Sequence, residues 1–165
     1  MPVIILEGID GSGKSTLAEH ILEASQVKTT IVHRGPLEGT VEDELIYPLL
    51  RLQPDELLIT DRWHVGEMIY GPIYRGKSLV EGDYNDIIEN MLWDMNAVKV
   101  ILSPSLSVVR RRLIERGEDY LQPEHINQVH EAYEQYAADF GYRLIREVTP
   151  TTAKELYALA MEGVN

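Results

Sequence analysis

The chain has 165 residues, of which 44% are hydrophobic and 25% charged, and it contains no cysteine. This size and composition fit one globular domain, agree with a cytoplasmic enzyme, and exclude disulfides and thiolate metal sites. Acidic residues outnumber basic ones by 27 to 15, so the net charge of −12 disfavours nucleic acid as a partner and favours small molecules.

The hydrophobic pattern predicts strands and helices that alternate along the chain. The expected strands are 3–6, 29–33, 57–60, 98–102 and 142–148. The expected helices are 15–25, 41–52, 83–96, 105–116, 123–140 and 151–161. Residues 70–82, which are rich in Gly, Pro and Tyr, are expected to form a loop. Asp83 is expected to cap the helix that follows this loop.

Strict alternation predicts an α/β fold, with a five-stranded parallel sheet and helices on both faces, in three layers. No repeat or linker divides the chain, so residues 1–165 are expected to form a single domain. No segment approaches the roughly 18 apolar residues of a membrane span. No basic region precedes the first apolar run, so we expect neither a membrane segment nor a signal peptide.

The first expected strand leads directly into a glycine-rich segment that matches the P-loop motif. The residues expected to bind a nucleoside triphosphate are Gly8, Asp10, Gly11, Ser12, Gly13, Lys14, Ser15 and Thr16. The glycines let the backbone wrap an anion with its N–H groups pointing inward, and the following helix adds the positive end of its dipole. Lys14 is expected to reach the β- and γ-phosphates, and Ser15 to hold Mg²⁺. The motif predicts a P-loop NTPase fold with ATP and Mg²⁺ as cofactors.

Two charged residues, Asp61 and Arg62, follow the third expected strand. In a parallel sheet this position lies at the carboxyl edge, beside the P-loop. A carboxylate there can order the metal shell, and a guanidinium can clamp a phosphate through two hydrogen bonds. An ordinary surface ion pair is the alternative, but the position favours a catalytic role for both residues.

A run of arginines ends the helix expected at 105–116. Arg112 and Arg116 are four residues apart and therefore share one helix face, and Gly117 then lets the chain turn. Arginines that close over a transferred phosphoryl group stabilise its negative charge. A solvated basic helix end is the alternative. We expect a short LID at about 116–123.

These segments together resemble the thymidylate kinase family, within the nucleoside and nucleotide kinases. The resemblance rests on residues 6–16, 33–40, 61–63 and 112–119. It implies that Asp10 contacts the deoxyribose hydroxyl of the acceptor, that Arg62 binds the acceptor's 5′-phosphate, and that Arg116 belongs to the LID. Residues 63–76 depart from the family pattern beside the base pocket, so the identity of the base stays open. The resemblance also leaves a homodimer open.

The acceptor is a phosphate or a hydroxyl, and the two need different chemistry. A phosphate is already ionised and needs only clamping arginines, whereas a sugar hydroxyl needs a general base. Deoxynucleoside kinases, which the chain also resembles, have a glutamate where this second strand ends on His33 and Arg34. This favours a monophosphate as acceptor. The expected clamp consists of Arg34, Arg62 and Arg75. His33, Glu38 and Asp61 remain candidate bases for a hydroxyl acceptor.

Several aromatic residues are expected near the substrate. Trp63 and Tyr70 are candidate substrate-binding residues, although Trp63, Tyr70 and Tyr74 fit base stacking and ordinary packing equally well. Trp93 is expected in the core or in a dimer contact.

The predicted function is transfer of the γ-phosphoryl group of ATP to a pyrimidine deoxynucleoside monophosphate resembling dTMP. The alternatives are a deoxynucleoside kinase acting on a 5′-hydroxyl, and a kinase acting on a modified pyrimidine or a nucleic-acid hydroxyl. A binding module without activity is disfavoured by the arginines expected to serve transfer.

Overall fold

Five parallel strands form one sheet in the computed structural model, which describes residues 1–117 and 121–162. The strands are β1 (Val3–Gly8), β2 (Lys28–His33), β3 (Glu56–Asp61), β4 (Val98–Leu102) and β5 (Arg143–Ile145). Their order across the sheet is β2-β3-β1-β4-β5, and every neighbouring pair is parallel. The predicted α/β class with a five-stranded parallel sheet is confirmed.

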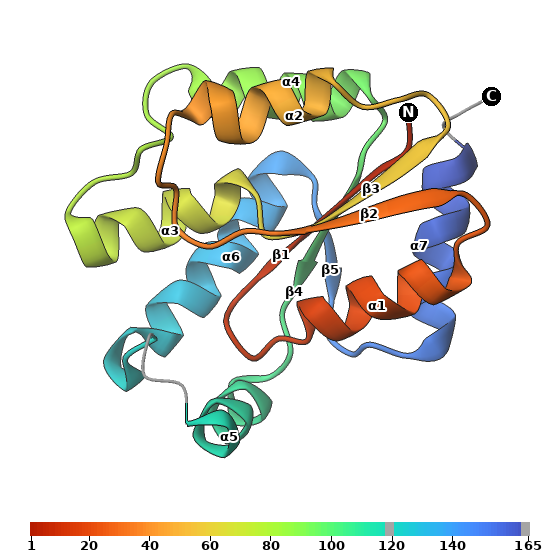
Figure 1. Ribbon diagram of the computed structural model, residues 1–165. Coiled ribbons are helices and arrows are strands. Elements are labelled where there is room, and N and C mark those ends of the chain that lie inside the picture. Colours follow the sequence, from red (N-terminus) through yellow and green to blue (C-terminus); the bar gives the residue numbers. More distant parts are fainter. Residues whose placement is uncertain (118–120, 163–165) are drawn as a thin grey trace.

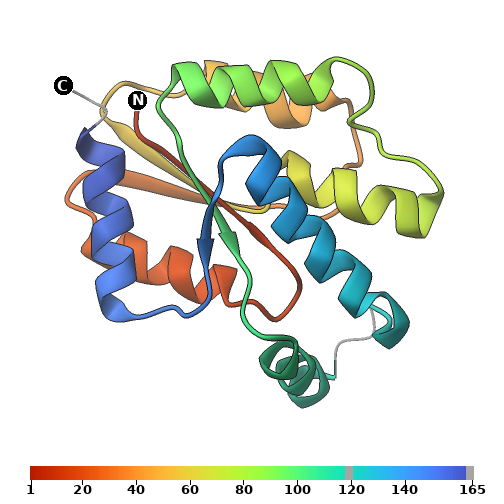
Figure 2. The ribbon, with the colours of Figure 1, turned by 180° about the vertical axis from the view of Figure 1, so that it is seen from behind.

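Helices cover both faces of this sheet (Figures 1 and 2). One face carries α1 (Lys14–Ala24) and α7 (Pro150–Glu162), and the other carries α3 (His64–Arg75) and α6 (Ile126–Phe140). The second layer is extended by η1 (Glu42–Ile46), α2 (Tyr47–Leu50) and α4 (Tyr84–Asp94). The remaining helices, α5 (Leu106–Arg116) and η2 (Pro123–His125), lie near the end of the sheet where β4 leaves it.

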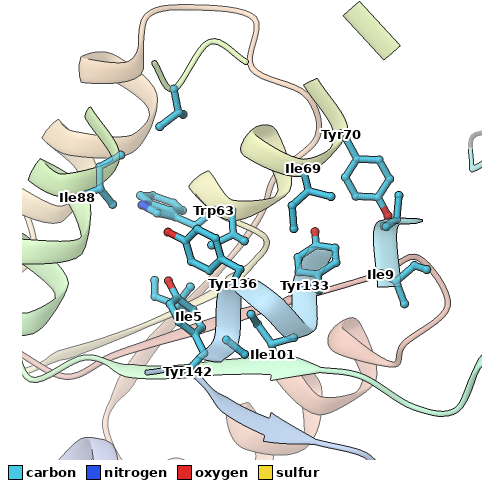
Figure 3. Close-up of a cluster of buried hydrophobic side chains, with 14 of the residues drawn as sticks. Ile5, Ile9, Trp63, Ile69, Tyr70, Ile88, Ile101, Tyr133, Tyr136 and Tyr142 are labelled. Atoms are coloured by element: carbon cyan, nitrogen blue, oxygen red, sulfur yellow. The ribbon is translucent and has the colours of Figure 1, made fainter. Parts of the chain in front are cut away.

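Two apolar cores follow from the alternation of side chains along the central strand. Ile4 and Leu6 of β1 belong to the core under α1 and α7, whereas Val3 and Ile5 belong to the core under α3 and α6. Because both faces of β1 are covered, its sequence is one continuous apolar run and not an alternating one. Figure 3 shows the second core, in which Trp63, Tyr133 and Tyr136 gather between α3 and α6.

The expected loop at 70–82 is wrong for its first residues, because α3 continues to Arg75. The Gly and Pro content of this segment predicted a loop, but Gly71 and Pro72 lie within the helix and do not end it. The helix is held by a buried face that includes Val65 and Ile69. It ends only at Gly76, whose φ of 75° is the left-handed conformation that favours glycine.

Other expected elements change at their ends. The helix expected at 41–52 is divided into a π-helical turn and α2, where Pro48 lacks the N–H that a continuous helix needs. The strand expected at 142–148 is shorter at both ends. It starts one residue later, because the N–H of Tyr142 donates to Ala137 O (3.0 Å) at the end of α6, and it ends at Ile145.

Two expectations for α4 are met only in part. Asp83 is in the N-cap position of α4, as predicted, but its side chain makes no capping hydrogen bond. The core position expected for Trp93 is wrong, because α4 turns Ile88 and Leu92 toward the core and leaves Trp93 76% exposed. The alternative of a dimer contact stays a prediction. Within the described ranges, no helix combines the length and apolar character needed to cross a bilayer.

Candidate active site

The P-loop joins the end of β1 to the start of α1. Gly8 lies so close to β4 that a Cβ on it would be 2.4 Å from the carbonyl oxygen of Leu102. Gly11 and Gly13 have φ angles of 74° and 101°, which L side chains rarely adopt. Only glycine therefore lets the loop pass β4 and then curl back to the N-terminus of α1.

Lys14 lies inside this curl. Its buried Nζ donates hydrogen bonds to Gly8 O (2.8 Å), Ile9 O (3.0 Å) and Ser12 Oγ (3.4 Å). Burial, together with the positive charge of Arg62, lowers the pKa of Lys14 to about 8. The negative charge of a bound triphosphate would stabilise the charged form of this ammonium group.

Oxygen ligands suited to a magnesium ion meet beside the loop. Ser15 Oγ donates to Asp61 Oδ2 (2.6 Å), and the same oxygen lies 3.1 Å from His33 Nδ1. The register explains this meeting, since Asp61 pairs with Leu6 of β1 on one side and with His33 of β2 on the other. A hydroxyl and a carboxylate are hard oxygen donors of the kind Mg²⁺ prefers, so these residues fit that ion. Thr16 follows on the exposed side of α1.

Arg62 forms an ion pair with Asp10 of the P-loop. The Tyr70 hydroxyl donates to the other carboxylate oxygen of Asp10 (2.9 Å) and lies 3.3 Å from the Asp10 N–H. Burial disfavours the charge of Arg62, but the Asp10 carboxylate together with Tyr133, Tyr70 and Asp61 outweighs it, so the pKa of the guanidinium is raised. Burial and the same carboxylate raise the pKa of Tyr70 well above its usual value. Tyr70 is therefore a neutral hydrogen-bond donor.

A cavity of about 210 Å³ opens beside this cluster, on the α3 side. It is lined by residues from the loop after β2, from the end of β3 and from α3: Gly35, Pro36, Arg62, Trp63, Gly66, Glu67, Tyr70, Tyr74 and Arg75. Tyr70 and Tyr74 stack with 6.2 Å between ring centroids. Glu67 and Arg75 form an ion pair, and Glu67 Oε1 also accepts the N–H of Leu79 (2.9 Å). The cavity combines aromatic faces with one carboxylate and two guanidinium groups.

A second, polar cavity of about 180 Å³ lies over the P-loop. Its lining joins the loop to the charged groups around it: Asp10, Gly11, Gly13, Lys14, Ser15, Thr16, Asp61, Arg62 and Arg116. Arg62 borders both cavities. A phosphate of a molecule in the first cavity could therefore meet a phosphate held over the P-loop at this one guanidinium.

The two arginines predicted for the LID reach the P-loop in different ways. Arg112 of α5 donates from Nη1 to Gly11 O (3.0 Å) and Ser12 O (3.2 Å), whereas Arg116 borders the polar cavity. The LID was expected at about 116–123, and its residues 118–120 lie outside the described residues.

The predicted clamp is only partly assembled. Arg62 and Arg75 line the first cavity, but Arg34 is absent from the described lining. Arg34 instead pairs with Glu44 (3.2 Å), and its guanidinium stacks 4.5 Å over the Trp63 ring. Arg34 therefore packs against Trp63, which lines the cavity.

Two acidic residues at the site were not foreseen. Glu67 belongs to no sequence motif. Only its position one helical turn before Tyr70, a candidate substrate-binding residue, could have indicated that it lies at the site. Glu7 is a carboxylate inside an otherwise apolar strand, and an acid in such a strand is a signal that sequence analysis can find.

No family model matches the chain. Among curated proteins, it is 26% identical to the SPbeta prophage-derived uncharacterized protein YorR of Bacillus subtilis over 143 residues, which cover 86% of this chain and 85% of YorR. It is 31% identical to guanylate kinase of Mannheimia succiniciproducens over 136 residues (70% and 65% of the two chains). It is 30% identical to a probable thymidylate kinase of Methanosarcina barkeri over 92 residues, which span 51% of this chain but 45% of that protein.

Solved structures share the fold. A crystal structure of YorR in complex with phosphorylated GDP superimposes with a TM-score of 0.74 at 23% identity, over 96% of this chain and 95% of YorR. Deoxyadenosine kinase of M. mycoides with bound dATP gives a TM-score of 0.55 at 19% identity, over 98% and 100% of the two chains. The same fold thus recurs in two proteins whose structures were solved with bound nucleotides.

Proposed function

Since the chain belongs to the P-loop nucleoside and nucleotide kinases, we propose that it transfers the γ-phosphoryl group of ATP to a deoxynucleoside monophosphate. The observation that carries the proposal is that Arg62 borders both the cavity over the P-loop and the cavity under α3. A guanidinium in this place can hold the acceptor phosphate against the donor.

The donor would lie on the P-loop. The loop amides and Lys14 bind its phosphates, and Ser15 and Asp61 hold the Mg²⁺ that neutralises charge on the transferred group. Arg112 and Arg116 approach from α5 and exclude water, which would otherwise compete as the acceptor.

The acceptor would lie in the cavity beneath α3. An oxygen of its ionised phosphate attacks the γ-phosphorus, the bond to the β–γ bridging oxygen breaks, and ADP leaves with the bonding electron pair. No proton has to be removed from the acceptor, so the reaction needs no general base. Because Arg62 already holds Asp10, the acceptor phosphate has to share or replace that ion pair on binding.

We assign a dTMP-like base to this cavity. Thymine carries an N–H donor next to a carbonyl acceptor, and the Glu67–Arg75 pair offers an acceptor next to a donor. Guanine carries the same pair of groups, and the relatives include guanylate kinase and the YorR complex with phosphorylated GDP. The test therefore includes GMP and dGMP.

A hydroxyl acceptor is the second candidate, and one observation favours it. The Asp10 carboxylate lines the cavity over the P-loop and pairs with Arg62, which borders both cavities, so it could take the proton from a sugar 5′-hydroxyl.

A coupled assay for ADP release with Mg²⁺ and ATP tests both candidates. Nucleosides, their monophosphates and short oligonucleotides are supplied one at a time. ADP released only with a monophosphate, together with a nucleoside diphosphate in the products, supports the proposal. Release only with nucleosides supports the hydroxyl candidate, and release only with oligonucleotides contradicts both.

A further inference from the structure

Glu7 is a buried carboxylate that has no part in the reaction proposed above. It lies on β1, one residue before the P-loop, and its exposure is 0%. Alternation along the strand places its side chain on the same face as Ile5, toward α3 and α6. Burial raises the pKa of this carboxyl. A buried carboxylate costs free energy of folding unless hydrogen bonds or neighbouring charges compensate for its lost solvation.

One carboxylate oxygen of Glu7 caps α3. Glu7 Oε1 accepts the backbone N–H groups of Trp63 (2.7 Å), Val65 (3.1 Å) and Gly66 (3.4 Å). These are orphan amides of the first turn, and Trp63 in the N-cap position supplies no side-chain cap of its own. A carboxylate from the central strand therefore fixes where α3 begins.

The other oxygen faces Arg62 and Tyr133. A Cβ on Gly66 would lie 3.4 Å from Arg62 Cδ, 3.5 Å from the Tyr133 hydroxyl and 3.6 Å from Glu7 Oε2, so these three groups converge on one glycine. Glu7 Oε2, Arg62 Nε and the Tyr133 hydroxyl are all buried and have no hydrogen-bond partner within residues 1–117 and 121–162. Figure 3 shows the Tyr133 hydroxyl directed from α6 toward α3.

The backbone around Arg62 is tied to β1 on both sides. The Arg62 N–H donates to Leu6 O (2.9 Å), and the next N–H, that of Trp63, donates to Glu7. Between these two bonds Arg62 has a φ of 70°, a left-handed conformation that a long side chain rarely adopts. Such a conformation persists only where its surroundings hold it.

We propose that Glu7 is a positioning residue, which holds the junction of β3 and α3 so that the Arg62 guanidinium stays between the donor and acceptor cavities. The proposal rests on the proposed function in one respect, that Arg62 binds the acceptor phosphate. Glu7 itself touches neither substrate.

Kinetics of Glu7→Gln test the proposal. The amide oxygen can still accept the N–H groups of α3, but the charge and the second acceptor are lost. The KM for the acceptor should rise about tenfold, while the KM for ATP changes less than about twofold. Glu7→Asp keeps the charge but is one methylene too short for the same bonds, so it should raise the acceptor KM further.

Glu89→Gln is the matched control. Glu89 is also a buried carboxylate, and it also binds α3, through His64 Nε2 (2.9 Å), but it does not contact Arg62. This variant should lower thermal stability and leave both KM values within about twofold. A purely structural role for Glu7 would make Glu7→Gln behave in the same way.

A second measurement does not depend on activity. The Nε–H resonance of Arg62 can be followed by ¹⁵N NMR and assigned by its loss in Arg62→Lys. Glu7→Gln should shift or broaden this signal, and Glu89→Gln should leave it in place. An unchanged Arg62 signal, or equal increases in both KM values, overturns the proposal. If the wild-type protein transfers phosphate to no monophosphate, the proposed function fails, and the NMR signal alone then decides the role of Glu7.

Discussion

The donor and acceptor sites proposed for this chain are built in different ways. The proposed donor site is a continuous segment, residues 8–16, whose backbone conformation is set by glycines and whose expected ligand groups are mostly N–H groups. The acceptor cavity is assembled from side chains of three separate segments. A site made of backbone depends on a few fixed residue types, whereas a site made of side chains depends on packing, so a motif identifies the first more completely than the second.

The two sites share one residue. Arg62 borders both cavities and pairs with Asp10 of the P-loop, so its contacts couple the acceptor cavity to the donor loop. Substitutions that act on one site, on the other, or on neither therefore separate the contributions of the two sites to activity.

The largest effect is expected from Lys14→Ala on the donor side. Loss of the ammonium removes its stabilisation of the phosphates, so kcat should fall by about a thousandfold or more. Circular dichroism should show that the fold is preserved. Lys28→Ala is the control, since Lys28 is exposed and pairs with Glu56 (3.0 Å), away from the P-loop. Equal activity of the two variants would refute the donor assignment.

Arg62→Ala should act mainly on the acceptor side. The kcat/KM for the acceptor should fall about a hundredfold, because a charge-assisted bond to its phosphate is lost. Calorimetry should find ATP binding nearly unchanged. Arg34→Ala is the matched comparison and should cost less, because Arg34 pairs with Glu44 behind the cavity wall. Equal loss of ATP and acceptor binding in Arg62→Ala would contradict the assigned role.

Glu67→Gln should change the choice of base more than the rate. The carboxylate lines the cavity, so its loss weakens recognition of an N–H group on the base. The ratio of kcat/KM between the best monophosphate and dCMP should fall by about tenfold. Glu81→Gln, at an exposed position, is the control. An unchanged ratio would place the base elsewhere.

Glu89→Gln should have the smallest effect on catalysis and act on stability alone. Burial disfavours the ionised carboxyl, but hydrogen bonds from His64, Lys99 and Tyr136 outweigh it and lower its pKa from 4.5 to about 2. Because the folded-state pKa is the lower one, this stabilisation is present above pH 4.5 and is lost as the pH falls toward 2.

Urea unfolding at a series of pH values measures this effect. Between pH 5 and pH 2, the free energy of unfolding of the wild type should fall by about 2 kcal/mol more than that of Glu89→Gln. If the free energy of unfolding falls equally with pH in the two proteins, the Glu89 carboxyl does not cause the loss of stability in acid.

The sheet and the P-loop could be predicted from sequence because their signals are local. Val3–Leu6 is an apolar run, the glycines have fixed spacing, and Asp61 comes directly after an expected strand. Helix α3 was not predicted, because Gly71 and Pro72 indicate a loop unless the buried contacts of Ile69 and Tyr70 are known.

The lining of the proposed acceptor cavity could be predicted in part for the same reason. Arg62, Trp63, Tyr70 and Arg75 line the cavity as candidate residues should, since they follow β3 or lie on α3. The position of Arg34 depends on Glu44, a partner ten residues away with no motif to mark it. The core position expected for Trp93 was wrong because the helical pattern of α4 does not show which apolar face is the buried one.

The most direct test of the account is to identify what receives the phosphoryl group. The wild-type protein is incubated with Mg²⁺, ATP and one acceptor at a time, and the products are resolved by ³¹P NMR. The account predicts the paired β-phosphate and α-phosphate signals of a new nucleoside diphosphate, formed from a deoxynucleoside monophosphate and nearly absent with Arg62→Ala. A nucleoside converted to its monophosphate, or a diphosphate formed equally well by Arg62→Ala, would contradict it.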